Sequence, residues 1–319
     1  MRDALGGRAL PRYRRHAMDL VFVALAGFLA ALVDGALGMG FGPTSSSILL
    51  GTGLSPAATS TTVNIAKVAT GIVAAISHWR FRNIDHRLVL RLALPGCLGA
   101  IVGVTVLSNV DGAAIRPWLA VLLIVVGLRI MWRFSRPVVS KAEDFTDTDH
   151  DPARMPDWDS RGTEVVAAAG GVTNGLIGAW GPVVTPFLMH RELPPRFAVG
   201  SVNTAEVAVA AVSVGSLIAS LGSGGLDVGV VLAMLGGGIV AAPVAAWFVR
   251  HVQPRPMGVA VACLLLLTNV RELAGWADLG VSRWLLYGVV LAATVGAALR
   301  PRLTPTAPLP GDEAGEAAP

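Results

Sequence analysis

The chain has 319 residues, of which 53% are hydrophobic and only 14% are charged, and its mean hydropathy is +0.63. A soluble domain carries about 25% charged residues, so this chain lacks the polar surface that would keep it in water. The formal net charge of +4 comes from arginines that flank apolar stretches, and it gives no reason to expect a nucleic-acid partner.

Nine apolar stretches follow one another along the chain, and most approach the roughly 20 residues that cross a bilayer. They lie at about residues 18–50, 57–77, 88–108, 114–132, 163–190, 197–221, 228–249, 257–270 and 284–299. This pattern predicts an all-α, polytopic membrane protein, which we expect to be multi-pass in the cell inner (cytoplasmic) membrane.

The sequence divides into six segments. They are a basic N-terminal tail (1–17), a first membrane repeat (18–133), an acidic flexible linker (134–162), a second membrane repeat (163–275), an extra transmembrane helix (283–299) and a disordered tail (300–319). The linker shows no apolar periodicity, and the last segment is rich in proline and acidic residues, so neither is expected to pack.

The first apolar stretch is too long for one straight crossing, because 33 residues would make a helix about 50 Å long. Its middle holds Asp34, several glycines and Pro43, which weaken a helix interior, so we expect a broken or re-entrant helix there. The freed N–H groups after the break, together with Thr44 and Ser45, form an end that suits an anion. Asp34 either accepts freed N–H groups or couples transport to an ion.

The same pattern returns further along the chain. Residues 63–67 (VNIAK) recur as 202–206 (VNTAE), and the Gly-Pro pair at 42–43 recurs at 181–182, both at a spacing of 139. A spacing this steady indicates two internal repeats of about four segments each, with a broken or re-entrant first helix in both. Breaks in corresponding positions point to the binding site of a transporter.

Lys67 and Glu206 occupy equivalent positions in the two repeats, inside segments where a charge is costly. One interpretation is that Lys67 captures an oxyanion, and the other is a structural ion pair with Glu206. A buried pair adds little net stability, which favours the first. Asn64 and Asn203 lie one helical turn earlier and face the same sides. Glu206 is the candidate proton carrier.

Charges in the connecting loops favour an inverted second repeat. Loop 78–91 is basic and its counterpart 222–227 has no basic residue, whereas loop 51–56 is neutral and its counterpart 190–196 is basic. Basic loops lie on the cytoplasmic side, so the copies need an odd number of crossings between them. A stretch that enters and returns without crossing supplies it.

These motifs resemble the TauE/SafE sulfite exporter family. The resemblance rests on the Gly-Pro breaks, on the turns at 56–60 (PAATS) and 195–201 (PRFAVGS), and on residues 180–185 (WGPVVT). It extends over about residues 18–275, although both breaks depart from the common GxGGG pattern. It implies a permease for sulfite, a sulfonate or a related organosulfur anion.

The sequence therefore predicts a secondary transporter for a small anion and not an enzyme. The alternative is a non-transporting membrane assembly or partner-binding protein that retains the transporter fold. We expect no cofactor and no metal site, because Cys97 and Cys263 lie far apart and no histidine cluster occurs. The expected partners are the anion and membrane lipid, with no nucleic acid. The sequence leaves open whether the protein forms a homo-oligomer.

Eleven residues are candidates for the functional site. The candidate substrate-binding residues are Lys67, Asn64, Asn203, Thr44, Ser45, Thr185, Gly42, Gly181 and Trp180, and the candidate ion- or proton-coupling residues are Glu206 and Asp34.

Overall fold

The computed structural model describes residues 12–37, 39–135, 158–222, 227–251 and 254–299. Within them the chain forms eleven α-helices, one short 3₁₀-helix and no β-strand, which confirms the all-α class. Most of the expected basic tail, acidic linker and C-terminal tail lies outside the described residues.

The helices follow one another with short connections. Their bounds are α1 Arg12–Leu37, α2 Phe41–Gly51, α3 Pro56–Arg80, α4 His86–Asn109, α5 Gly112–Ser135, α6 Thr163–Ile177, α7 Gly181–His190, α8 Pro195–Leu221, α9 Val228–His251, α10 Pro254–Trp276, η2 Gly280–Ser282 and α11 Arg283–Leu299. The expected first stretch thus contains two helices, α1 and α2, and the stretch at 163–190 contains α6 and α7.

Six segments are long and apolar enough to cross a membrane: α3, α4, α5, most of α8, most of α10, and η2 with α11. Shorter apolar stretches lie in α1 and α9. The outer face of α4 carries Leu90, Leu94 and Leu98 at a four-residue spacing, and these are 61%, 67% and 66% exposed. Such a face suits lipid and would be unfavourable in water. The structure therefore supports a multi-pass membrane protein.

Two pairs of helices approach each other through glycine. On one side α4 packs along α6, where a Cβ at Gly99 would overlap the backbone of Ala168. On the opposite side α1 packs along α9, where a Cβ at Gly27 would overlap the backbone of Met234. Small residues let helix backbones come close in lipid, where apolar burial contributes no driving force.

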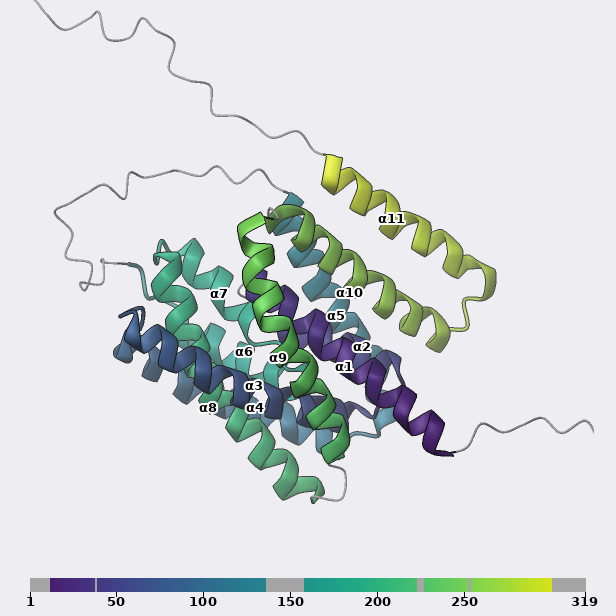
Figure 1. Cartoon of the computed structure of the whole chain (residues 1–319), viewed down its shortest axis with the longest axis horizontal. Coiled ribbons are helices and arrows are strands. Elements are labelled where there is room, and N and C mark those ends of the chain that lie inside the picture. The colour runs from purple at the N-terminus through teal and green to yellow at the C-terminus, as the bar shows by residue number, and fades with distance from the viewer. Residues whose placement is uncertain (1–11, 38, 136–157, 223–226, 252–253, 300–319) are drawn as a thin grey trace, which may run out of the picture.

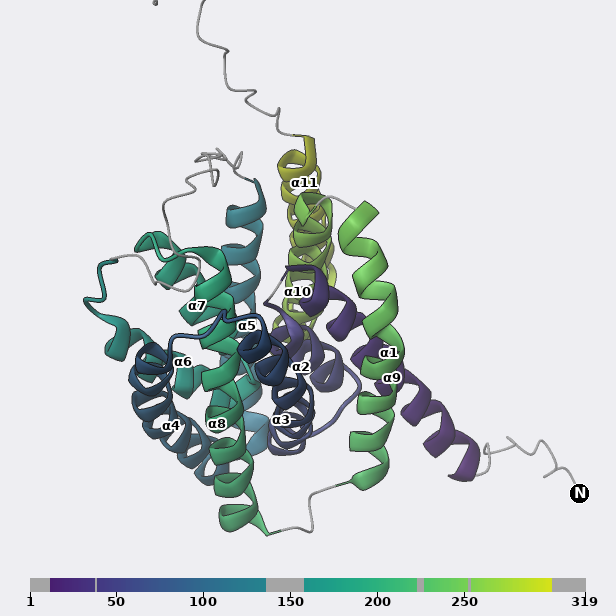
Figure 2. The same cartoon turned by 60° about the vertical axis from the view of Figure 1, so that its left-hand side comes forward.

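The remaining helices lie between and beside these pairs. α3 packs against α8 in the space between them, as Figure 2 shows. α5 packs against α10 through a buried core that includes Leu119, Leu123 and Leu265. α11 packs mainly on α10 at the edge of the molecule (Figure 1).

One end of the molecule is held together by an arginine, and we call it the Arg116 end. Arg116, in the first turns of α5, pairs with Glu272 near the end of α10, with Nη1 and Oε1 3.0 Å apart. Its Nη2 also donates to the carbonyl of Leu54, 2.7 Å away, in the loop between α2 and α3.

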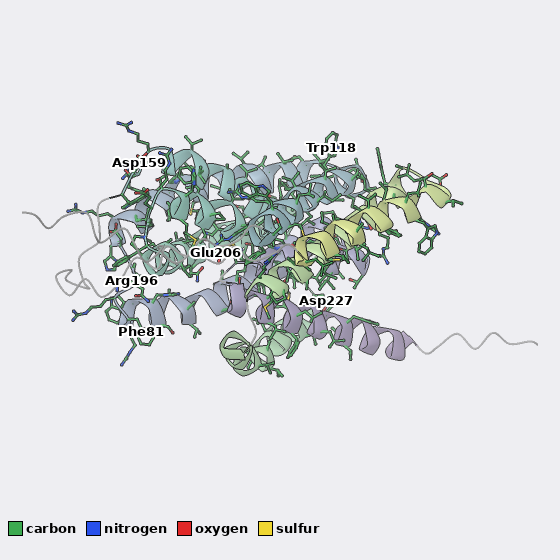
Figure 3. All side chains as sticks on the ribbon, turned by 90° about the horizontal axis from the view of Figure 1, so that it is seen from above. Phe81, Trp118, Asp159, Arg196, Glu206 and Asp227 are labelled. Carbon is green, nitrogen blue, oxygen red and sulfur yellow. The ribbon has the colours of Figure 1, made fainter. Side chains whose placement is uncertain are left out.

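The other end is held by contacts between α4, α6 and α8, and we call it the Ser201 end. The Ser201 hydroxyl accepts a hydrogen bond of 3.0 Å from the backbone N–H of Asp85. Arg91 and Glu164 pair at 2.8 Å. In Figure 3, Phe81, Asp159 and Arg196 mark this end, Trp118 and Asp227 lie toward the other, and Glu206 lies between them.

Candidate functional site

Helix α6 ends at its C-cap residue, Gly178, before α7 begins. This residue has a φ of 68°, in the left-handed region that favours glycine. The N–H of Gly178 donates to the carbonyl of Asn174 (2.8 Å) and the N–H of Ala179 to that of Thr173 (3.3 Å). This is the pairing of a Schellman motif, and it turns the Gly178 carbonyl away from the helix axis toward α3.

Lys67 of α3 meets this break. Its ammonium donates to the Gly178 carbonyl at 2.6 Å and to the Asn174 side-chain oxygen at 3.0 Å, and it forms an ion pair with Glu206 of α8. The Lys67 side chain is only 6% exposed and that of Glu206 18%. An ammonium has three N–H donors, so these three acceptors satisfy the buried charge in full.

Asn174 connects the break to α3 and α8. Its amide nitrogen donates to the Asn64 side-chain oxygen (2.7 Å) and to the Ser213 hydroxyl (3.1 Å). The Asn64 amide nitrogen donates in turn to the carbonyl of Ser60 (2.9 Å). We call Lys67, Glu206, Asn174, Asn64 and the Gly178 carbonyl the Lys67 network. All of its polar atoms lie at the meeting point of α3, α6 and α8.

The break between α1 and α2 lies against the same point. α1 ends at Leu37 and α2 begins at Phe41, whose N–H donates to the Asp34 carboxylate at 3.2 Å. A Cβ at Gly42 would overlap the Gly178 carbonyl, so the two breaks are in backbone contact. Asp34 thus holds the start of α2, which lies against the break that Lys67 contacts.

The predicted hydroxyls differ in their surroundings. The Thr44 and Thr185 hydroxyls are buried and have no hydrogen-bond partner within the described part of the chain. Buried polar groups in a membrane protein are costly without a partner, so a bound water or ligand at either hydroxyl would be stabilising. The Ser45 hydroxyl instead donates to the Phe41 carbonyl one turn earlier, at 2.6 Å, and is satisfied within α2.

The other predicted residues lie around the network. Trp180 is completely buried, and its indole N–H donates to the Val202 carbonyl of α8 at 3.2 Å. Its ring lies against Gly96 of α4 and Gly170 of α6. Asn203 is half-buried one turn before Glu206. Gly181 faces Met39, and a Cβ added there would lie at an ordinary distance of 3.5 Å from the Met39 Cβ.

A cavity of about 610 Å³ opens near the last turns of α5 and α7. It is lined by Met39, Arg129, Ile130, Trp132, Arg133, Pro182, Pro186, Phe187, Met189 and His190. Met39 and Pro182 flank the two breaks, so the cavity extends from the surface to the broken helices. Its described lining residues include two arginines and no carboxylate.

At the Arg116 end the corresponding region is closed. The remaining space is about 10 Å³ and is lined by Ser47, Thr268, Asn269, Arg116, Glu272 and their neighbours. The Asn269 amide donates to the Ser47 hydroxyl at 2.7 Å, which joins α10 to α2. Together with the Arg116–Glu272 pair, this contact closes the space between α2, α5 and α10.

Sequence reasoning missed two parts of this arrangement. Asn174 is not among the candidate residues, and its link to Lys67 joins residues 107 apart in sequence. Arg133 gave no signal because an arginine near a helix end is usual at a membrane boundary. Within the described ranges no three His, Cys, Asp or Glu residues lie close enough to hold a metal.

Known proteins are similar in sequence to this chain over most of its length. The family model described as sulfite exporter TauE/SafE matches residues 23–272, which run from α1 to α10 and contain the whole Lys67 network. The chain is similar to the "Probable membrane transporter protein YtnM" of Bacillus subtilis (strain 168), with 37% identity over 258 residues, or 80% of this chain and 82% of the relative. No solved structure matches the chain.

The contact between the breaks yields a prediction for two glycines. We expect Gly42→Ala to lower the thermal stability of the purified protein, because its Cβ would overlap the Gly178 carbonyl and force the breaks apart. Such overpacking costs about 1–3 kcal/mol. Gly181→Ala is the matched control, since its Cβ would make only an ordinary contact. Thermal unfolding in detergent measures both, and equal midpoints for the two variants would contradict the backbone contact.

Proposed function

We propose, because the chain belongs to the sulfite exporter TauE/SafE family and is a membrane transporter, that it is a secondary permease for a small anion. Sulfite, a sulfonate or a related organosulfur anion is the proposed substrate, and the cytoplasmic membrane is the proposed location. The observation that carries the proposal is the position of Lys67, a buried ammonium at the junction of two broken helices.

Lys67 has the properties of an exchangeable anion site. Two of its three acceptors, the Gly178 carbonyl and Asn174, are neutral and fixed by the break, whereas the third is the Glu206 carboxylate. An oxyanion that replaces Glu206 would keep the ammonium paired and would gain charge-assisted hydrogen bonds. Glu206 would then be left without its cation, and protonation would remove the cost of burying that charge. Substrate binding and proton uptake would thus be linked.

Several contacts support a pair of inverted repeats. α1 packs on α9 as α6 packs on α4, and α3 packs on α8, which is the reciprocal pattern that a two-fold relation produces. Gly42 lies against Gly178, and Gly181 lies against Met39, positions that exchange at the 139-residue spacing. In this proposal α1–α2 and α6–α7 are re-entrant hairpins that enter from opposite sides and meet in the middle.

The loops give further support. The contact between Asp85 and Ser201 places loop 81–85 beside the start of α8, so the basic regions 78–91 and 190–196 lie at the same end. The neutral α2–α3 loop lies at the Arg116 end, through its contact with Arg116. An inverted second repeat would produce this distribution, because corresponding loops of the two copies would lie on opposite sides.

The open cavity and the closed Arg116 end suggest alternating access. The cavity is lined by Pro186, Ile130 and Arg133. The residues at the equivalent positions, 139 residues away, are Ser47, Asn269 and Glu272 respectively, and they close the other end. Equivalent positions are thus apart at one end of the molecule and joined at the other. In the proposed cycle the Arg116–Glu272 and Ser47–Asn269 contacts open when the cavity closes, and the Lys67 network stays between the two paths.

Counterflow in proteoliposomes tests the function and the role of Lys67. We expect the wild-type protein to exchange labelled sulfite or a sulfonate, and Lys67→Met to lose this exchange by about tenfold or more, because hydrogen bonds to a charged group are lost. Thr70→Val is the control, since that hydroxyl, one turn later on α3, bonds only the Ala66 carbonyl (2.9 Å).

Folding must be controlled separately. Lys67→Met leaves Glu206 buried without its cation, and such a loss destabilises by about 3–5 kcal/mol. The double variant Lys67→Met/Glu206→Gln removes both charges, and we expect it to be stable yet inactive. Normal exchange by the double variant would show that the anion does not bind at Lys67. If the wild type exchanges none of the anions, the protein is not such a permease.

A second prediction concerns the coupling to protons. We expect Glu206→Gln to retain counterflow, because Lys67 keeps its two neutral acceptors, and to lose accumulation driven by a pH gradient, because an amide takes up no proton. Uptake with an acidic exterior measures accumulation, and exchange at equal pH measures counterflow. Should Glu206→Gln still concentrate the anion in response to the gradient, the coupling residue lies elsewhere, with Asp34 next in line.

A further inference from the structure

We propose that the cavity at the end of α5 and α7 contains a second anion site, centred on Arg133, where the substrate docks before it reaches Lys67. The site would take a small oxyanion such as a sulfonate. The inference rests on the proposed transport of an anion and adds a binding site on its path.

The contacts of Arg133 are the first argument. Its guanidinium nitrogens donate to the sulfur of Met39 at 3.5 Å and to that of Met189 at 3.4 Å. A thioether is a weak acceptor, and a guanidinium is built to bind a carboxylate, sulfonate or phosphate through two parallel hydrogen bonds. Arg133 is half-buried, so its charge is partly removed from water without a strong acceptor among these contacts.

The rest of the cavity has the same electrostatic character. Arg129 lies one turn earlier on α5 and lines the same cavity. His190 lines the same space from the end of α7. Two like charges that line one cavity repel each other, and the described lining residues include no carboxylate to offset them, so an anion bound between them would be favourable. The arrangement therefore favours an anionic ligand.

The shape of the cavity connects this site with the Lys67 network. Its volume of about 610 Å³ lies within the ~300–1,000 Å³ that is usual for small-molecule sites. Met39 and Pro182 line it at the two breaks, and Gly181, beside Pro182, begins α7. Thr185, in the next turn of α7, carries the buried hydroxyl without a partner. An anion that leaves Arg133 would move toward backbone N–H groups and this hydroxyl.

Comparison with the closed end gives an independent argument. The position 139 residues after Arg133 is Glu272, which pairs with Arg116 and closes its own side. Arg133, by contrast, forms no ion pair with any described residue. One face of its guanidinium lies over the Phe134 ring, 5.8 Å from the centroid, so its described partners are two thioethers and an aromatic ring. An oxyanion would supply the strong acceptor that this set does not include.

A chemical labelling experiment tests the site without transport. The two cysteines, Cys97 and Cys263, are replaced by alanine, and Met189→Cys provides a thiol beside Arg133. The rate of its reaction is measured with a sulfonatoethyl (anionic) and a trimethylammonioethyl (cationic) methanethiosulfonate. We expect the added Arg133→Gln change to lower the anionic rate about tenfold, since a charge-assisted hydrogen bond is lost, and not to lower the cationic rate.

Two controls make the result specific. Arg87→Gln removes an exposed arginine at the same end but outside the cavity, and it should leave both rates unchanged. Arg133→Lys keeps the charge and should retain most of the anionic rate, so a loss confined to Arg133→Gln is not a folding defect. An anionic rate that Arg133→Gln leaves unchanged, or that Arg87→Gln lowers as much, would overturn the proposal.

The outcome is separable from that of the proposed function. If labelling behaves as expected but the wild type exchanges no anion, the cavity binds anions and the permease proposal fails. If exchange requires Lys67 while labelling shows no dependence on Arg133, the permease proposal stands and the second site does not exist.

Discussion

The arrangement depends on one buried ammonium at the end of a broken helix. Where α6 stops, the carbonyl of Gly178 has no partner in a helix, and such a group is unstable in a membrane protein interior. Lys67 supplies the missing donor at 2.6 Å, and in turn requires the acceptors that Asn174 and Glu206 provide. The break and the charge therefore stabilise each other, and neither would be stable alone.

Close approach of backbones makes this contact geometrically available. Gly42 brings the start of α2 directly onto the Gly178 carbonyl, so a side chain at position 42 would separate the two breaks. The glycine contacts of α1 with α9 and of α4 with α6 hold the two broken segments from the outside. The network is thus enclosed by helices that have little freedom near it, whereas the two ends of the molecule differ, one open and one closed.

The helical membrane class and the family could be recognised from the sequence because hydropathy and the recurring VNxA and Gly-Pro motifs are local signals. The pairing of Lys67 with Glu206 was weighed because the two positions are equivalent at the 139-residue spacing. The role of Asn174 was not visible, because it depends on where α6 ends in space. The Ser45 hydroxyl, a candidate substrate contact, donates to the carbonyl one turn earlier, and sequence alone does not show this partner, because a hydroxyl within a helix can bond either its own helix or a ligand.

The cavity beside Arg133 was also beyond sequence reasoning. Its lining combines residues of α5 and α7 with Met39, and no sequence motif or repeat indicates that these three segments lie together. An arginine in the last turn of a membrane helix has the same sequence signature whether it faces headgroups or a cavity.

The most direct measurement of the central claim is a crystal structure of the protein with selenite, a sulfite analogue whose selenium can be located by its anomalous signal. The account predicts a selenium peak within hydrogen-bond distance of the Lys67 ammonium and the Asn174 side chain, with Glu206 moved away from Lys67. A Lys67–Glu206 pair that stays intact while selenium binds elsewhere in the protein would contradict it.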